Sequence, residues 1–165
     1  MPLEIAVNEP DNHSKHIEHY AQRHCSTQWR LFLELVFDEL FNSAGKEESS
    51  GFWRHIGSRM AIEMPMGECA TLESLEKAIN EALNLLDWGY VSIIAEHQKM
   101  RICHSACPIP GDSQEGIDIG LLAMSALLEG LYKGWLSQQG GDMEVPITCI
   151  SCNAEQRECT FLYGR

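Results

Sequence analysis

The spacing of the apolar residues changes along the chain, and this change constrains the fold more than any other feature. Between residues 26 and 87 the apolar residues recur three and four positions apart, which is typical of amphipathic helices. Two later stretches, residues 90–104 and 145–163, contain short β-rich runs around polar turns and predict two hairpins. The 165 residues can bury one good core. The sequence therefore predicts a single α/β (α+β) domain, with an antiparallel sheet from two hairpins packed with about four helices.

The first helix is predicted to start near Ser26 and to bury one apolar face. The residues of that face are Trp29, Phe32, Leu33, Val36, Phe37 and Leu40. Residues 42–50 are rich in Ser, Gly and Glu, so we expect a connecting loop there. A second helix is expected to end before Pro65. Its apolar residues are Phe52, Trp53, Ile56 and Met60.

A third helix is predicted between Thr71, a suitable N-cap, and Asp87. Its expected buried face consists of Leu72, Leu75, Ile79, Leu83 and Leu86. Residues 1–25 are polar instead and are expected to form a mobile arm, so the domain proper would span residues 26–165. The histidines of this arm are His13, His16, His19 and His24, and a solvated arm is the expected role for them.

A long helix is predicted from about Ile119 to Leu136, between the two hairpins. Ala126, Gly130 and Gly134 lie four residues apart on one of its faces. Glycine in a helix costs roughly 0.5–1 kcal/mol relative to alanine, so the stripe predicts close approach by a packed helix or by another copy of the chain. We expect it at or near a contact between copies. The apolar run of this helix is shorter than the roughly 20 residues that cross a bilayer, so no membrane span is predicted.

The charge of the chain excludes one class of partner. With 24 acidic and 12 basic residues the net charge is −12, which would repel a phosphate backbone. Nucleic acid is therefore not an expected partner. Neutral polysaccharides, small molecules and protein surfaces remain open.

Seven cysteines accompany an N-terminus without the features of a secretory signal. This combination predicts reduced thiols and a cytoplasmic location. The odd number also excludes complete internal pairing. In the alternative location, the periplasm, Cys149 and Cys152 would be the expected pair.

Cys149 and Cys152 form a CxxC motif that, together with Cys159, provides the candidate metal ligands of the chain. On a regular strand, residues three apart point to opposite faces, so we expect free, mostly buried cysteines and neither metal nor cofactor. Cys103 and His104 are adjacent on a predicted strand and would also face opposite sides. We expect a buried thiol and a surface imidazole there, and no catalytic dyad.

Sequence motifs for common enzyme chemistries are absent. The chain contains no GxxxxGK[ST] or GxGxxG phosphate loop, no GxSxG nucleophile elbow and no HExxH zinc motif. The tryptophans Trp29, Trp53, Trp88 and Trp135 fall on predicted buried faces or at an element end, so core packing is the expected role for most of them. We therefore expect a protein without catalytic residues.

Residues 75–141 resemble the family of the bacterial cellulose synthase D subunit, which is also called cellulose synthase operon protein D. The resemblance is carried by EKAINEALNLLDWGYVSIIAEHQKMRICHSACP and LLEGLYKGWLSQQGG. It implies a non-catalytic α/β accessory protein that forms a ring-shaped octamer, a tetramer of dimers, and guides β-1,4-glucan chains together with other synthase subunits. It identifies no glucan-contacting residue. The candidates for fold and assembly are Trp88, Gly89, Glu129, Gly130, Tyr132 and Trp135, beside the stripe of Ala126 and Gly134.

The order of elements is also similar to that of the vinyl-reductase-like small-molecule-binding domains. In those domains a cysteine-bearing last hairpin recurs, and Cys149 and Cys159 occupy such a hairpin here. This alternative implies a ligand sensor or carrier with an apolar pocket between the long helix and the sheet.

Overall fold

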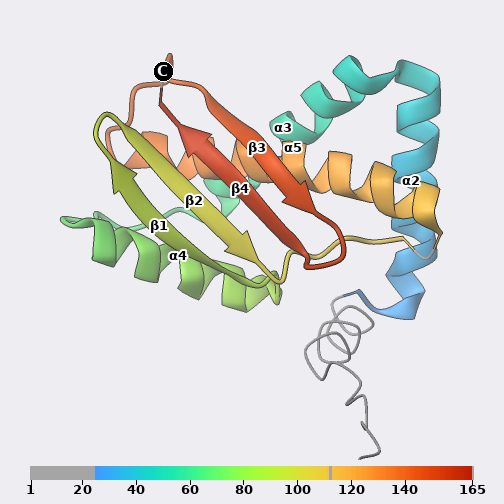
Figure 1. Ribbon diagram of the computed structural model, residues 1–165, viewed down its shortest axis with the longest axis horizontal. Helices are drawn as coiled ribbons and strands as arrows, with labels where there is room; N and C mark the ends of the chain where they lie inside the picture. Colours follow the sequence, from blue (N-terminus) through green and yellow to red (C-terminus); the bar gives the residue numbers. More distant parts are fainter. Residues whose placement is uncertain (1–24, 112, 165) are drawn as a thin grey trace, which may run out of the picture.

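The computed structural model describes residues 25–111 and 113–164 and places helices on a small sheet (Figure 1). The elements are α2 Thr27–Ala44, α3 Lys46–Glu63, α4 Leu72–Leu86, β1 Tyr90–Glu96, β2 Lys99–Ser105, α5 Gln114–Gln138, β3 Ile147–Asn153 and β4 Glu158–Tyr163. The predicted single α+β domain with two hairpins is confirmed. The predicted arm, apart from Cys25, and its histidines lie outside the described residues.

The sheet is antiparallel, with strand order β1-β2-β4-β3, so the two hairpins join through β2 and β4. Its buried residues share one face, because Ile93, Ile102 and Phe161 are successive cross-strand partners. Helices α4 and α5 lie on that side of the sheet (Figure 1). The core therefore sits between one face of the sheet and these two helices.

Side chains of α4 protect the edge strand β1. The side-chain amide of Asn80 donates to the carbonyl of Val91 and accepts from its N–H, at 2.9 and 2.7 Å. The N–H of Ile93 donates to Glu76 at 2.6 Å. An unprotected edge strand can pair with another chain, and these contacts remove that possibility along the first half of β1.

The small residues of α5 pack against α3 within the same chain. A Cβ atom on Gly130 would lie 1.9 Å from the carbonyl oxygen of Arg54, and one on Gly134 would lie 2.4 Å from the Cβ of Ala61. Gly57 of α3 approaches α5 as closely, since its Cβ would lie 1.9 Å from the Leu127 oxygen. Helix α3 of the same chain supplies the predicted close approach. The expected position of the stripe at or near a contact between copies stays a prediction.

The junction between α2 and α3 differs from the prediction. The loop expected at residues 42–50 is wrong, because α2 continues to Ala44 and α3 begins at Lys46, with only Gly45 between them. Gly45 has φ of +85°, a conformation that glycine adopts readily. Glu47 and Glu48 lie in the first turn of α3, where the helix dipole favours acidic side chains. Polar composition alone suggested a loop at what is a helix start.

Helix α4 agrees closely with the prediction. The side chain of Thr71 accepts from the N–H of Ser74, and Asp87 ends the helix in the left-handed conformation. Helix α5 starts earlier than predicted, because Ser113 caps it by accepting from the N–H of Gly116. None of the helices within the described ranges is long and apolar enough to cross a membrane.

The predicted buried face of α2 is only partly correct. Phe37 is buried, but Trp29 and Phe32 remain 56% and 54% exposed. Of the remaining tryptophans, Trp53 and Trp135 are buried and Trp88 is half-buried. The side of α2 that faces the core is centred on Phe37, so α2 keeps a second apolar side in contact with solvent.

Candidate functional site

A β-bulge brings the CxxC cysteines to one face of the last hairpin. Cys149 pairs with Phe161 and Ser151 pairs with Thr160, so Ile150 is an additional residue in β3. The additional residue reverses the alternation of side chains beyond it. Cys149 and Cys152 therefore both point inward, and the expectation that they face opposite sides is wrong.

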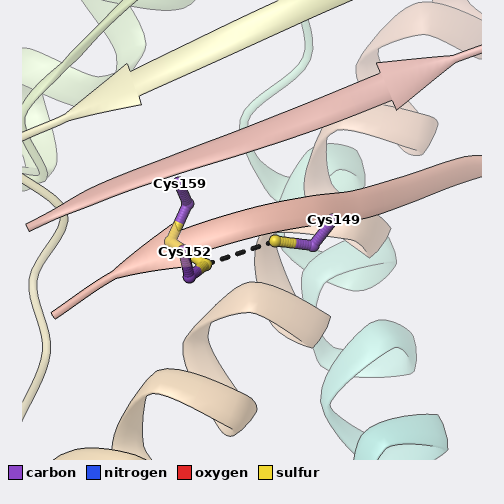
Figure 2. Close-up of side chains that lie close together, drawn as sticks. All are labelled: Cys149, Cys152 and Cys159. Carbon is purple, nitrogen blue, oxygen red and sulfur yellow. Dashed lines mark hydrogen bonds between the residues drawn. A yellow bond between two sulfur atoms is a disulfide. The ribbon is translucent and has the colours of Figure 1, made fainter.

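The bulge assembles a group of three sulfur atoms, which we call the sulfur cluster: Cys149, Cys152 and Cys159 (Figure 2). Cys152 lies directly opposite Cys159 and forms a disulfide with it. The Sγ of Cys149 lies 3.2 Å from that of Cys152. The expectation of reduced thiols is wrong for Cys152 and Cys159. The disulfide expected for a periplasmic location, between Cys149 and Cys152, is also wrong, because Cys149 is a free thiol beside the bond.

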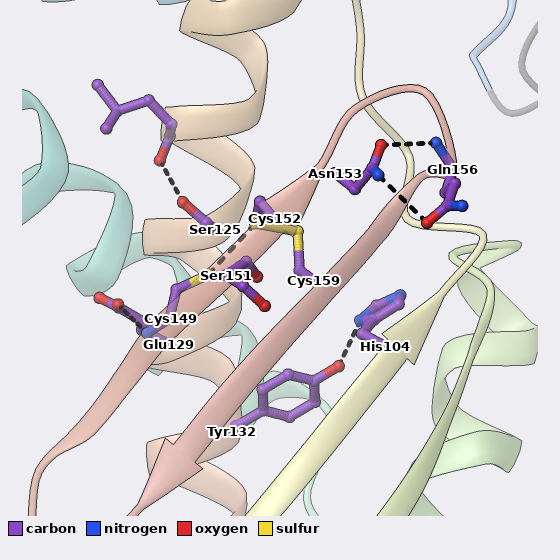
Figure 3. Close-up of a disulfide and its surroundings, with 11 residues drawn as sticks. His104, Ser125, Glu129, Tyr132, Cys149, Ser151, Cys152, Asn153, Gln156 and Cys159 are labelled. Carbon is purple, nitrogen blue, oxygen red and sulfur yellow. Dashed lines mark hydrogen bonds between the residues drawn. A yellow bond between two sulfur atoms is a disulfide. The ribbon is translucent and has the colours of Figure 1, made fainter.

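Glu129 connects the sulfur cluster to α3 and α5. One of its carboxylate oxygens accepts from the backbone N–H of Cys149 at 2.7 Å (Figure 3). The other accepts from Nε of Arg54 at 2.6 Å. Glu129 is buried, whereas the Arg54 side chain is half exposed. Both carboxylate oxygens are therefore used to hold β3 and α3 against α5.

The surroundings of two free thiols, those of Cys149 and Cys107, keep them protonated. Burial and the charge of Glu129 raise the pKa of Cys149 to about 11, and burial raises that of Cys107 to about 12. A thiol attacks as the thiolate, so neither group is activated as a nucleophile at neutral pH. The cluster in this form is not a catalytic centre for thiol chemistry.

Cys103 and His104 face opposite sides of β2, as predicted, but their burial is the reverse of the expectation. His104 is buried and Cys103 is half-buried, because the face of β2 that carries His104 is the one covered by the helices. The Nε2 of His104 lies 2.7 Å from the carbonyl oxygen of Trp88, so it must carry the proton. The Nδ1 atom then accepts from the hydroxyl of Tyr132.

The residues that carry the family resemblance lie in contacts inside the described chain. The carbonyl oxygen of Trp88 accepts from Nε2 of His104, and the hydroxyl of Tyr132 donates to Nδ1 of His104. Gly89 has φ of +79°, and a Cβ atom there would lie 2.2 Å from the oxygen of Ser105. The indole N–H of Trp135 donates to the carbonyl oxygen of Met64 at 2.9 Å. Trp88, Tyr132 and Glu129 thus join helices to the sheet, whereas Gly130 and Trp135 join α5 to α3 and to the residue that follows it.

An apolar cavity of about 180 Å³ lies beside α2 and α5. Phe37 of α2, Trp53 of α3, Met124 of α5 and residues 108–111 line parts of it. Among the described residues its lining includes none from a strand, so the cavity does not lie between the long helix and the sheet. The pocket position implied by the vinyl-reductase-like alternative is therefore not the position of this cavity.

Sequence reasoning missed several residues that build these contacts. Gly57 faces the α5 stripe, Arg54 pairs with Glu129, and Asn80 covers the edge of β1. A glycine inside a predicted helix was a signal for Gly57. Arg54 and Asn80 carried no such signal, because their partners lie far away in the sequence or on another element.

Known proteins are similar in sequence to most of this chain. Residues 15–164 match the family model that describes the D subunit of cellulose synthase. A cellulose synthase operon protein D from Komagataeibacter xylinus is 34% identical over 113 residues, which cover 67% of this chain and 70% of the relative. The protein of the same name from Komagataeibacter sucrofermentans has the same identity and coverage.

A further cellulose synthase operon protein D from Komagataeibacter xylinus is 31% identical over 142 residues, or 82% of this chain and 89% of the relative. These matches extend well beyond the two segments that carry the resemblance in the sequence. The chain therefore belongs to the family of the cellulose synthase D subunit.

Proposed function

We propose that this protein is a non-catalytic accessory subunit of bacterial cellulose synthase that assembles into a ring-like homo-octamer, a tetramer of dimers. The ring guides or organises nascent β-1,4-glucan chains for export and crystallisation, beside the other synthase subunits. The observation that carries the proposal is the family match over residues 15–164. A glucan chain is neutral, so the net charge of −12 does not oppose its passage.

The second apolar side of α2 supports self-assembly. Leu31 and Leu35 are 63% and 59% exposed and lie one helical turn apart, beside the exposed rings of Trp29 and Phe32. A helix that is apolar on more than one side is normally buried on both. In the proposed ring, a second copy of the chain covers this side.

The non-catalytic role is supported by how the buried polar groups are used. His104 and Tyr132 bond to each other, and Glu129 bonds to Arg54 and to the backbone of Cys149. General acid–base catalysis requires a group within hydrogen-bonding reach of a substrate proton. These groups direct their hydrogen bonds to other parts of the protein.

The experiment is deletion of the protein in its cellulose-producing host. Glucosyl transfer from UDP-glucose is measured in isolated membranes, and the yield and crystallinity of the extracellular cellulose are measured in parallel. We expect transfer to persist while fibre yield or order falls, and the wild-type chain supplied in trans to restore both. Unchanged cellulose after deletion contradicts an organising role, and loss of glucosyl transfer itself contradicts an accessory one.

A further inference from the structure

The three sulfur atoms of the sulfur cluster already lie close enough together, with the Cys152–Cys159 disulfide in place, to share one metal ion once that disulfide is reduced. The Sγ atoms of Cys149, Cys152 and Cys159 all lie within 4.8 Å of one another. In a tetrahedral zinc site with Zn–S bonds of about 2.3 Å, neighbouring sulfur atoms are about 3.8 Å apart. The three side chains need only small rotations to reach this spacing, because the bulge at Ile150 has already turned the CxxC cysteines to one face.

The position of the cluster suits a site with one open coordination position. Cys159 is buried, whereas Cys149 and Cys152 are half-buried. A hollow of about 450 Å³ beside β3 is lined by residues 148–152 and by Ser125 and Glu129 of α5. A cation can enter from this hollow, and a water molecule has space to complete a four-coordinate site with three protein ligands.

We propose that the sulfur cluster binds one Zn²⁺ ion through Cys149, Cys152 and Cys159 when the Cys152–Cys159 disulfide is reduced. Reduction by a dithiol breaks the S–S bond, gives two thiols and leaves the reductant as its own disulfide. Binding of Zn²⁺ then displaces one proton from each of the three thiols. The strands of the last hairpin are thus linked in two ways, by the disulfide under oxidising conditions and by a bound zinc ion under reducing conditions.

The test uses the purified full-length protein, reduced with a phosphine under nitrogen, supplied with excess Zn²⁺ and then separated from free metal by gel filtration. We expect about one zinc ion per chain, as in a mononuclear site, and several-fold less in protein left oxidised. Co²⁺ in place of Zn²⁺ is expected to give a thiolate-to-metal charge-transfer band. Far-ultraviolet circular dichroism of each sample follows the fold.

Cys149→Ser is the discriminating variant, because it removes a ligand and leaves both members of the disulfide in place. Cys103→Ser is its matched control, a half-buried cysteine on β2 that lies outside the cluster. We expect Cys149→Ser to lose zinc several-fold and Cys103→Ser to retain it. Equal zinc in the wild type and in Cys149→Ser overturns the proposal, as does a reduced wild type that binds no zinc or stays unfolded in its presence.

Discussion

His104 shows how one buried side chain depends on three parts of the fold. It lies on β2, donates to the carbonyl after α4 and accepts from Tyr132 of α5. Burial lowers its pKa to about 4, since the charged imidazolium would lose its hydration there. The hydrogen bond to the carbonyl of Trp88 raises the pKa of His104, but by less than burial lowers it. The neutral form is therefore the form that the folded protein stabilises.

The stability of the protein is expected to fall in acid because of His104. The unfolded pKa is about 6.5, so the stabilisation is complete above that pH and is lost as the pH falls toward 4. Between pH 7 and pH 5 the loss amounts to about 2 kcal/mol from this group. Urea unfolding at both pH values measures it.

Two substitutions separate this effect from the titration of other groups. His104→Gln removes the imidazole and is expected to lose this part of the pH dependence. His55→Gln, at an exposed position of α3, is expected to retain it. If His104→Gln and the wild type lose the same free energy of unfolding between pH 7 and pH 5, the assignment to His104 is wrong.

Helices α3 and α5 form the central helix pair, and their contact depends on missing side chains. Gly57 and Gly130 each lie against a backbone oxygen of the opposite helix. The approach leaves no space for a methyl group at either position. Glycine weakens both helices locally, and the packing that it permits offsets this cost.

Gly130→Ala is expected to lower the free energy of unfolding by about 2 kcal/mol or more, because the backbone of Arg54 must move to admit the methyl group. Gly51→Ala is the matched control on α3, where a Cβ atom meets nothing within 4 Å. It is expected to raise the free energy by about 0.5–1 kcal/mol through helix propensity. Urea unfolding of both variants measures the difference, and equal stability of Gly130→Ala and wild type would contradict the packing argument.

At the scale of the whole molecule, α2 carries more exposed large apolar side chains than any other element among the described residues. Its core side contributes Phe37, while its other apolar side faces solvent. The sheet edge at β1 is covered by α4 and the α5 stripe by α3. Self-association is therefore expected to use α2 before either of those surfaces.

The solution mass by light scattering tests this expectation. Under the proposed function, the wild type is expected to have a mass near eight copies. Leu31→Glu combined with Leu35→Glu is expected to reduce it several-fold, because burying two unpaired carboxylates opposes association. Leu85→Glu is the control, since Leu85 is also exposed but lies on α4. A wild-type monomer, or an unchanged mass in the double variant, contradicts the role of α2.

Much of the fold is encoded in local patterns. The leucine spacing and the Thr71 cap predicted α4, the turns predicted both hairpins, and the glycine stripe predicted close packing on α5. These features could be predicted from the sequence because each depends on residues within one helix or one hairpin. The segments LLDWG and LLEGLYKGW also identified the family.

Other features depend on contacts between distant segments. Which face of β2 is buried follows from the side on which α4 and α5 pack, so the sequence did not distinguish His104 from Cys103. The partner of the glycine stripe is α3, since its backbone lies against Gly130. The sulfur cluster exists because one unpaired residue, Ile150, shifts the register of β3 against β4. Strand alternation has a period of two, so a shift by one residue exchanges the faces, and only the tertiary structure decides where such a shift occurs.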